Sequence, residues 1–199
     1  MTAAPSFLRG ASTLMAGNAG VQILGLLCNL LIARLVAPED FGVAATFAAL
    51  LSILDGISDM AWDKLIIQAK DGDDASLMAS VHSLNLLRGL LLAIALFFNA
   101  EYLANLFGVP EAENAFAWLA LVPLVRGLSH MDPKRFQRDM SFGPEINVSL
   151  GSHLLGLIVA VITALWLGDY RAMLWGLVAQ ALGQAVITQV LAERRYQVG

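Results

Sequence analysis

Long apolar segments alternate with short polar ones along the whole chain. Six segments are apolar over about the twenty residues that a membrane-spanning helix requires. They are residues 11–33, 41–62, 79–99, 114–129, 147–167 and 172–192. The fourth is the shortest, and Pro123 and Arg126 interrupt it. The pattern predicts an all-α transmembrane bundle of six helices, with residues 1–199 forming one unit.

Polar side chains follow one face of most of these segments. At about 100° per residue, Asn18, Gln22 and Asn29 share a face of the first segment. The other stripes are His82, Asn85 and Arg88 in the third segment, Ser149, Ser152 and His153 in the fifth, and Gln180, Gln184 and Thr188 in the sixth. Hydrogen bonds between helices would explain any one stripe, and for both histidines we expect a neutral, hydrogen-bonded imidazole. Together the stripes are explained more simply by a water-filled cavity between helices.

The second segment carries three aspartates, Asp55, Asp59 and Asp63, each four residues after the last and therefore on one helical face. At 1.5 Å per residue, Asp55 lies about 6 Å to the cytoplasmic side of the midplane, Asp59 near the edge of the hydrocarbon, and Asp63 at the interface. Arg88 of the next segment falls within a few ångströms of the midplane. Two opposite charges at similar depth on consecutive helices predict an Asp55–Arg88 pair, which suits a structural or a functional role.

Small residues recur at a spacing of four in two segments. The ladders are Ala44, Ala48, Ser52 and Gly56 in the second segment, and Ser152, Gly156, Ala160 and Ala164 in the fifth. Ladders of this kind let helix backbones approach closely in lipid. They therefore indicate a packed bundle.

Composition supports a polytopic membrane protein. The chain is 58% hydrophobic and 14% charged, with a mean hydropathy of +0.69, whereas soluble domains carry about 25% charged residues. With six spans, one side of the membrane receives Arg9, Lys64, Lys70, Lys134, Arg135, Arg138, Arg194 and Arg195, and the other receives Arg34 and Arg171. Because Lys and Arg are enriched in cytoplasmic loops, both termini are predicted to be cytoplasmic.

Several classes of function are disfavoured. There is no basic patch for nucleic acid, and the single Cys28 excludes disulfides and cysteine-based metal sites within the chain. No pairing of nucleophile and base, no metal-ligand spacing and no glycine-rich phosphate loop is found. We therefore expect no catalytic residues, no metal, no cofactor and no enzymatic activity.

Two stretches resemble a known family. "NLLIARLVAPEDFGVAATFAALLSILDGISDMAWDKLIIQAKD" (29–71) resembles the N-terminal signature of the polysaccharide transporters, which are oligosaccharide flippases of the multidrug/oligosaccharidyl-lipid/polysaccharide superfamily. "HMDPKRFQRDMSFGPEI" (130–146) resembles the basic loop between the fourth and fifth spans of that family. The resemblance covers essentially the whole chain.

The resemblance implies transport of an oligosaccharide linked to undecaprenyl pyrophosphate from the inner to the outer leaflet of the bacterial inner membrane. On this interpretation Arg88 and Arg126 bind the pyrophosphate or acidic sugars, and Asp55 orients Arg88 or carries a coupling proton, with Asp59 as a second candidate for ion coupling. Substrate would also meet amides, namely Asn18, Gln22, Asn85, Gln180 and Gln184. A polymerase and glycosyltransferases are possible partners in the membrane.

Members of the resembled family have about twice as many spans, so the chain corresponds to one lobe. A second six-helix lobe, fused, homodimeric or on a separate chain, would be needed for alternating access. Two alternatives remain at this point. One is an ion-coupled drug antiporter of the same superfamily, with Asp55 as its ion site, and the other is a non-transporting membrane scaffold of a polysaccharide assembly complex.

Overall fold

The computed structural model describes residues 3–58, 75–137 and 141–192, and every regular element in these ranges is a helix. The elements are α1 (Ala3–Leu35), α2 (Pro38–Ser58), α4 (Ala75–Phe98), α5 (Ala100–Leu106), the 3-10 helix η1 (Pro110–Ala112), α6 (Glu113–Leu119), α7 (Leu121–Gly127), α8 (Asp132–Phe136), α9 (Gly143–Leu167) and α10 (Arg171–Leu191). The predicted all-α class is confirmed.

Five of the described helices, α1, α2, α4, α9 and α10, are long and apolar enough to cross a membrane. The fourth expected span, 114–129, differs because it forms two seven-residue helices, α6 and α7, that meet at Ala120. Pro123 explains the break, since its nitrogen carries no hydrogen for the carbonyl of Leu119 and its ring crowds that carbonyl.

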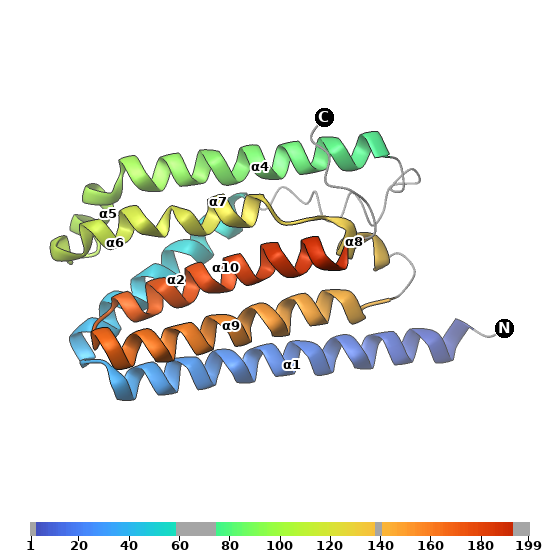
Figure 1. Cartoon of the computed structure of the whole chain (residues 1–199), viewed down its shortest axis with the longest axis horizontal. Coiled ribbons are helices and arrows are strands. Elements are labelled where there is room, and N and C mark those ends of the chain that lie inside the picture. The colour runs from blue at the N-terminus through green and yellow to red at the C-terminus, as the bar shows by residue number, and fades with distance from the viewer. Residues whose placement is uncertain (1–2, 59–74, 138–140, 193–199) are drawn as a thin grey trace.

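The long helices lie roughly along one axis (Figure 1). α1, α4 and α9 run in one direction, and α2, α10 and the α6–α7 pair run in the opposite direction. The α6–α7 pair lies against α4, α10 lies between this pair and α9, and α1 covers the outer side of α9. α2 packs on α10. The start of α1 and the end of α10 therefore lie at the same end of the bundle.

The largest hydrophobic cluster fills the half of the bundle that contains the turns at Gly108 and Gly168. Phe47 of α2, Phe116 of α6 and Leu174 of α10 are almost fully buried there. The rings of Phe47 and Phe116 meet edge to face, with centroids 5.1 Å apart. Among the described residues, the other half of the bundle has a much smaller hydrophobic cluster, formed by Met78, Val81 and Met131.

The ladder of small residues in α9 forms its interface with α10. All four members, Ser152, Gly156, Ala160 and Ala164, are buried. A Cβ placed on Gly156 would lie 3.0 Å from the carbonyl oxygen of Gly176 on α10. The ladder in α2 behaves differently, because only Ala44 of its members is buried and the other three are exposed.

A second close crossing joins α4 to α7. A Cβ on Gly89 would lie 2.5 Å from the backbone oxygen of Pro123 and 3.0 Å from the Cα of Gly127. Neither contact can be relieved by rotating a side chain. Glycine at this position therefore sets the distance between the two helices.

We predict that Gly89→Ala lowers the free energy of unfolding by about 1–3 kcal/mol, the usual cost of overpacking. Gly25→Ala is the matched control, because Gly25 is also in a helix and a Cβ there would meet nothing within 4 Å. Unfolding of the purified proteins in detergent, followed by circular dichroism, measures both. Equal stability of the two variants would contradict a close α4–α7 crossing.

Candidate functional site

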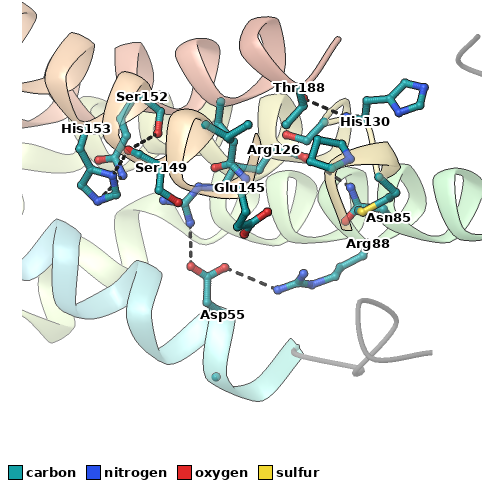
Figure 2. Close-up of a pocket in the computed structure, with 17 residues that line it drawn as sticks. Asp55, Asn85, Arg88, Arg126, His130, Glu145, Ser149, Ser152, His153 and Thr188 are labelled. Atoms are coloured by element: carbon teal, nitrogen blue, oxygen red, sulfur yellow. Dashed lines mark hydrogen bonds and ion pairs between the residues drawn. The ribbon is translucent and has the colours of Figure 1, made fainter. Parts of the chain in front are cut away.

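A polar cavity of about 500 Å³ occupies the half of the bundle opposite the main hydrophobic cluster (Figure 2). Its wall is contributed by α2, α4, α7, α8, α9, α10 and the segment between α7 and α8. The lining residues with charged or polar side chains are Asp55, Asn85, Arg88, Arg126, Ser129, His130, Glu145, Ser149, Ser152, His153, Gln180, Gln184 and Thr188. The polar faces of α4, α9 and α10 thus meet at one hollow, as their stripes predict.

Asp55 bridges two arginines on one side of this cavity. Arg126 Nη1 donates to Asp55 Oδ2 at 2.7 Å, and Arg88 Nη2 lies 3.5 Å from Asp55 Oδ1. Figure 2 shows the carboxylate between the two guanidinium groups. The side chains of Asp55, Arg88 and Arg126 are 46%, 29% and 26% exposed, so all three are open to the cavity.

The predicted Asp55–Arg88 pair is confirmed, and Arg126 is an unpredicted second partner. Arg126 comes from the same α7 that packs closely on α4 through Gly127 and Gly89. Asn85 strengthens this junction, because its Nδ2 lies within 3.3 Å of the carbonyl oxygens of Arg126 and Gly127. Both arginines therefore belong to one closely packed pair of helices, and the acid belongs to another helix.

The segment between α7 and α8 is held by side chains from helices on either side. The amide of His130 donates to Thr188 Oγ1 at 3.0 Å, and the amide of Met131 donates to His82 Nε2 at 3.1 Å. Gln189 Nε2 donates to the carbonyl oxygen of Leu128 at 3.0 Å. His82 thus accepts a hydrogen bond, as expected of a neutral imidazole.

The opposite wall of the cavity is uncharged over most of its length. His153 Nδ1 lies 2.8 Å from the carbonyl oxygen of Ser149, which makes this nitrogen the donor. Its Nε2 then accepts from Gln180 Nε2 at 3.1 Å. Ser152 donates its hydroxyl to the carbonyl oxygen of Ser149. This wall offers hydroxyl, amide and imidazole groups, which suit a neutral polar ligand.

A smaller hollow of about 190 Å³ adjoins the cavity between α1, α2, α9 and α10. Gln180 and His153 line both spaces, so their hydrogen bond stands at the boundary. Asn29 of the stripe in α1 lines this second hollow.

Of the residues predicted to bind substrate or ions, six line the cavity together: Asp55, Asn85, Arg88, Arg126, Gln180 and Gln184. Asn18 and Gln22 do not line it and are exposed on α1. Asp59 lies outside the described residues. Among the described residues no three His, Cys, Asp or Glu side chains are grouped as a metal site would require.

Sequence reasoning missed several lining residues, chiefly Ser129, His130 and Glu145. The first two follow the end of α7, and Glu145 lies in the first turn of α9, next to Pro144. All three fall at the ends of predicted spans, where helical periodicity carries no information about direction. No sequence signal would have identified them.

Comparison with known proteins agrees with this architecture. Residues 31–199 match the family described as polysaccharide biosynthesis protein. Over 164 residues the chain is 34% identical to the succinoglycan biosynthesis transport protein ExoT of Rhizobium meliloti (strain 1021), an alignment that covers 79% of this chain. The chain spans only 31% of the length of that relative. No solved structure matches. Because the match to the family covers residues 31–199, the chain belongs to the polysaccharide biosynthesis protein family.

Proposed function

We propose that this chain is one lobe of a flippase that moves undecaprenyl pyrophosphate-linked oligosaccharide across the bacterial inner membrane. The product would supply exopolysaccharide, capsule or O-antigen biosynthesis. One observation carries the proposal: two arginines face a polar cavity of about 500 Å³ inside an apolar helical bundle. Charged groups at such sites in membrane proteins usually belong to a substrate or ion pathway.

The two walls of the cavity fit the two parts of this substrate. Arg88 and Arg126 offer planar donor groups, which suit the oxygens of a pyrophosphate. The opposite wall, with Gln180, Gln184 and the serines of α9, suits sugar hydroxyls. A polyprenyl chain would remain in the surrounding lipid while its polar head enters the cavity.

We further propose six membrane crossings with both termini cytoplasmic. Residues 113–127 of α6 and α7 span about 22 Å if they continue in one direction, and Figure 1 shows α6 and α7 in line beside α4. A broken helix is tolerated at membrane depth when neighbouring helices cover it, and α4 and α10 pack on this pair. The cavity then lies in the cytoplasmic half of the bundle.

Alternating access requires a second lobe, whether fused, homodimeric or on a separate chain. α1 supports this requirement, because its outer face exposes apolar residues together with Asn18 and Gln22. These two amides join the substrate path only when another lobe closes over them. A polymerase and glycosyltransferases would act beside the assembled transporter.

The structure favours this function over ion-coupled drug antiport. In an antiporter Asp55 would bind the coupling ion, but each of its carboxylate oxygens already faces a guanidinium group. Two fixed positive charges oppose the binding of a sodium ion at this carboxylate. Asp55 is better suited to partner the arginines.

We predict that Arg126→Gln lowers polymer export at least tenfold in the bacterium that carries the gene, with normal protein abundance. We expect this reduction because the substitution removes the charged guanidinium group that would donate hydrogen bonds to the pyrophosphate. Arg171→Gln should export normally, because Arg171 pairs with Asp169 outside the cavity. Lipid-linked oligosaccharide should accumulate inside the Arg126→Gln strain. If the chain were instead a non-transporting scaffold, the substitution would reduce polymer assembly and no lipid-linked oligosaccharide would accumulate. Normal export by Arg126→Gln would refute the proposed role.

We predict that α6 and α7 together cross the membrane. In a Cys28→Ser background, Glu111→Cys should react with a membrane-impermeant maleimide in intact spheroplasts, and Ser141→Cys should react only after lysis. Both positions are exposed in the structure. Labelling of both Glu111→Cys and Ser141→Cys from outside would show that the pair enters and leaves on the same side, and the six-span topology would then be wrong.

A further inference from the structure

A separate hollow lies at the end of the bundle away from the polar cavity. It is formed between the start of α6 and the turn that joins α9 to α10, and Figure 1 shows both at the same end of the bundle. Its volume of about 430 Å³ is in the range of small-molecule binding sites. This space, called here the aromatic hollow, shares no lining residue with the polar cavity.

Two indole rings line the aromatic hollow. Trp118 of α6 and Trp175 of α10 lie with their ring centroids 6.3 Å apart and their planes inclined by 41°. Their exposed fractions of 54% and 36% leave ring surface available to a ligand. The face of an aromatic ring carries partial negative charge and attracts C–H groups. A pyranose ring with equatorial hydroxyls presents C–H groups on both faces, so such a sugar can stack on these indoles.

Polar groups stand beside the aromatic rings. The amide of Asn114 and the carboxylate of Glu111 line the hollow, and both residues are exposed. An amide can both donate to and accept from a sugar hydroxyl, and a carboxylate can accept. Stacking surface and hydrogen-bonding groups are therefore present together, as a saccharide requires.

The charge of the lining favours a neutral ligand. Among the described lining residues, the charged side chains are those of Glu111 and Arg171, which balance each other. Arg171 Nε lies 3.4 Å from Asp169 Oδ2, so we assign Arg171 no role in binding. A neutral sugar suits this lining better than a pyrophosphate does, whereas the arginines of the polar cavity suit the pyrophosphate.

The walls of the aromatic hollow are tied together. Tyr170 Oη donates to the carbonyl oxygen of Glu111 at 3.3 Å, which links the α9–α10 turn to η1. The Tyr170 ring also meets the buried Phe47 edge to face, with centroids 6.2 Å apart. Leu174, which lines the hollow, belongs to the main hydrophobic cluster. The hollow is thus built on the best-packed part of the bundle.

Tryptophan also gathers at membrane surfaces without binding any ligand. Trp166, near the end of α9, fits that pattern, because it is 83% exposed and does not line the hollow. Trp118 and Trp175 come from two different helices and line one space together with Asn114. A general affinity for the membrane surface does not explain that convergence.

We propose that the aromatic hollow binds the sugar part of the substrate on the side where it leaves the transporter. Trp118 and Trp175 stack on sugar rings, and Asn114 and Glu111 bind their hydroxyls. The inference rests on the proposed function, which supplies the class of substrate, and on the proposed topology, which places this end of the bundle outside the cytoplasm. It goes further by assigning sugar recognition to a second site, away from the arginines.

The test uses fluorine NMR of the full chain, labelled with fluorotryptophan, in phosphatidylglycerol nanodiscs that contain neither sugar nor choline. The probe is cellotetraose, a linear glucose oligomer with equatorial ring substituents. The signals of Trp118, Trp166 and Trp175 are assigned with single Trp→Phe variants. Mannitol, which has hydroxyls but no ring, and tetramethylammonium, a cation that aromatic rings also attract, are the comparison ligands.

We expect cellotetraose to shift the signals of Trp118 and Trp175 saturably and to leave the signal of Trp166 in place. Mannitol and tetramethylammonium should shift none of the three. This measurement is made on the wild-type side chains, so it does not depend on the folding of a variant that lacks an aromatic ring.

We also expect Trp175→Ala to weaken the affinity for cellotetraose about three- to tenfold, as the loss of one aromatic contact allows. The affinity is measured from the shift of the Trp118 signal. Trp175→Phe should retain most of the affinity, because the phenyl ring keeps an aromatic face. Trp166→Ala is the matched control and should bind as wild type does, since Trp166 is also exposed but lies outside the hollow.

The absence of a shift with cellotetraose would overturn the inference. So would equal shifts of Trp166 and Trp118, which would indicate contact with the membrane surface in general. A response to tetramethylammonium in place of cellotetraose would identify a cation site, and unchanged affinity in Trp175→Ala would remove the stacking role.

These outcomes leave the proposed function standing, because the effect of Arg126→Gln on export tests it independently. Conversely, the proposed function fails alone if Arg126→Gln exports normally while Trp118 and Trp175 still bind cellotetraose.

Discussion

One carboxylate and two guanidinium groups meet in the half of the bundle opposite the main hydrophobic cluster. In a membrane such charges are stable only when they are paired or face a hydrated space, and here both conditions hold. Asp55 pairs with Arg88 and Arg126, and all three side chains remain partly exposed. The shape of this half of the molecule follows, because α2 must stand close enough to α4 and α7 for the charges to meet.

The two halves of the bundle are built by different interactions. Around Phe47 and Phe116 the helices are held by aromatic and aliphatic packing. Around the cavity they are held by glycine-mediated backbone contacts and by hydrogen bonds such as that from the amide of Met131 to His82. The polar cavity thus lies beside an apolar cluster in which Phe47 and Phe116 are fully buried.

Membership of the polysaccharide biosynthesis protein family gives this arrangement a context, since the relative ExoT is a transport protein. Charged groups within a membrane-spanning bundle commonly line a substrate or ion pathway. In this chain such groups gather at one polar cavity, where Asp55 joins Arg88 and Arg126.

The sequence by itself determined the helical class, five of the six long helices that it predicted, and the polar faces of α4, α9 and α10, because helical periodicity and apolar length are local properties. The depth of Asp55 and Arg88 along their helices, estimated from the sequence, was enough to predict that they pair. Only the tertiary structure decided that Arg126 joins them, that Ser129 and His130 line the cavity, and that Asn18 and Gln22 do not. Those facts depend on which helices are neighbours and on how each is rotated, and on the break that Pro123 imposes at Ala120. The residue pattern within a single helix does not contain that information.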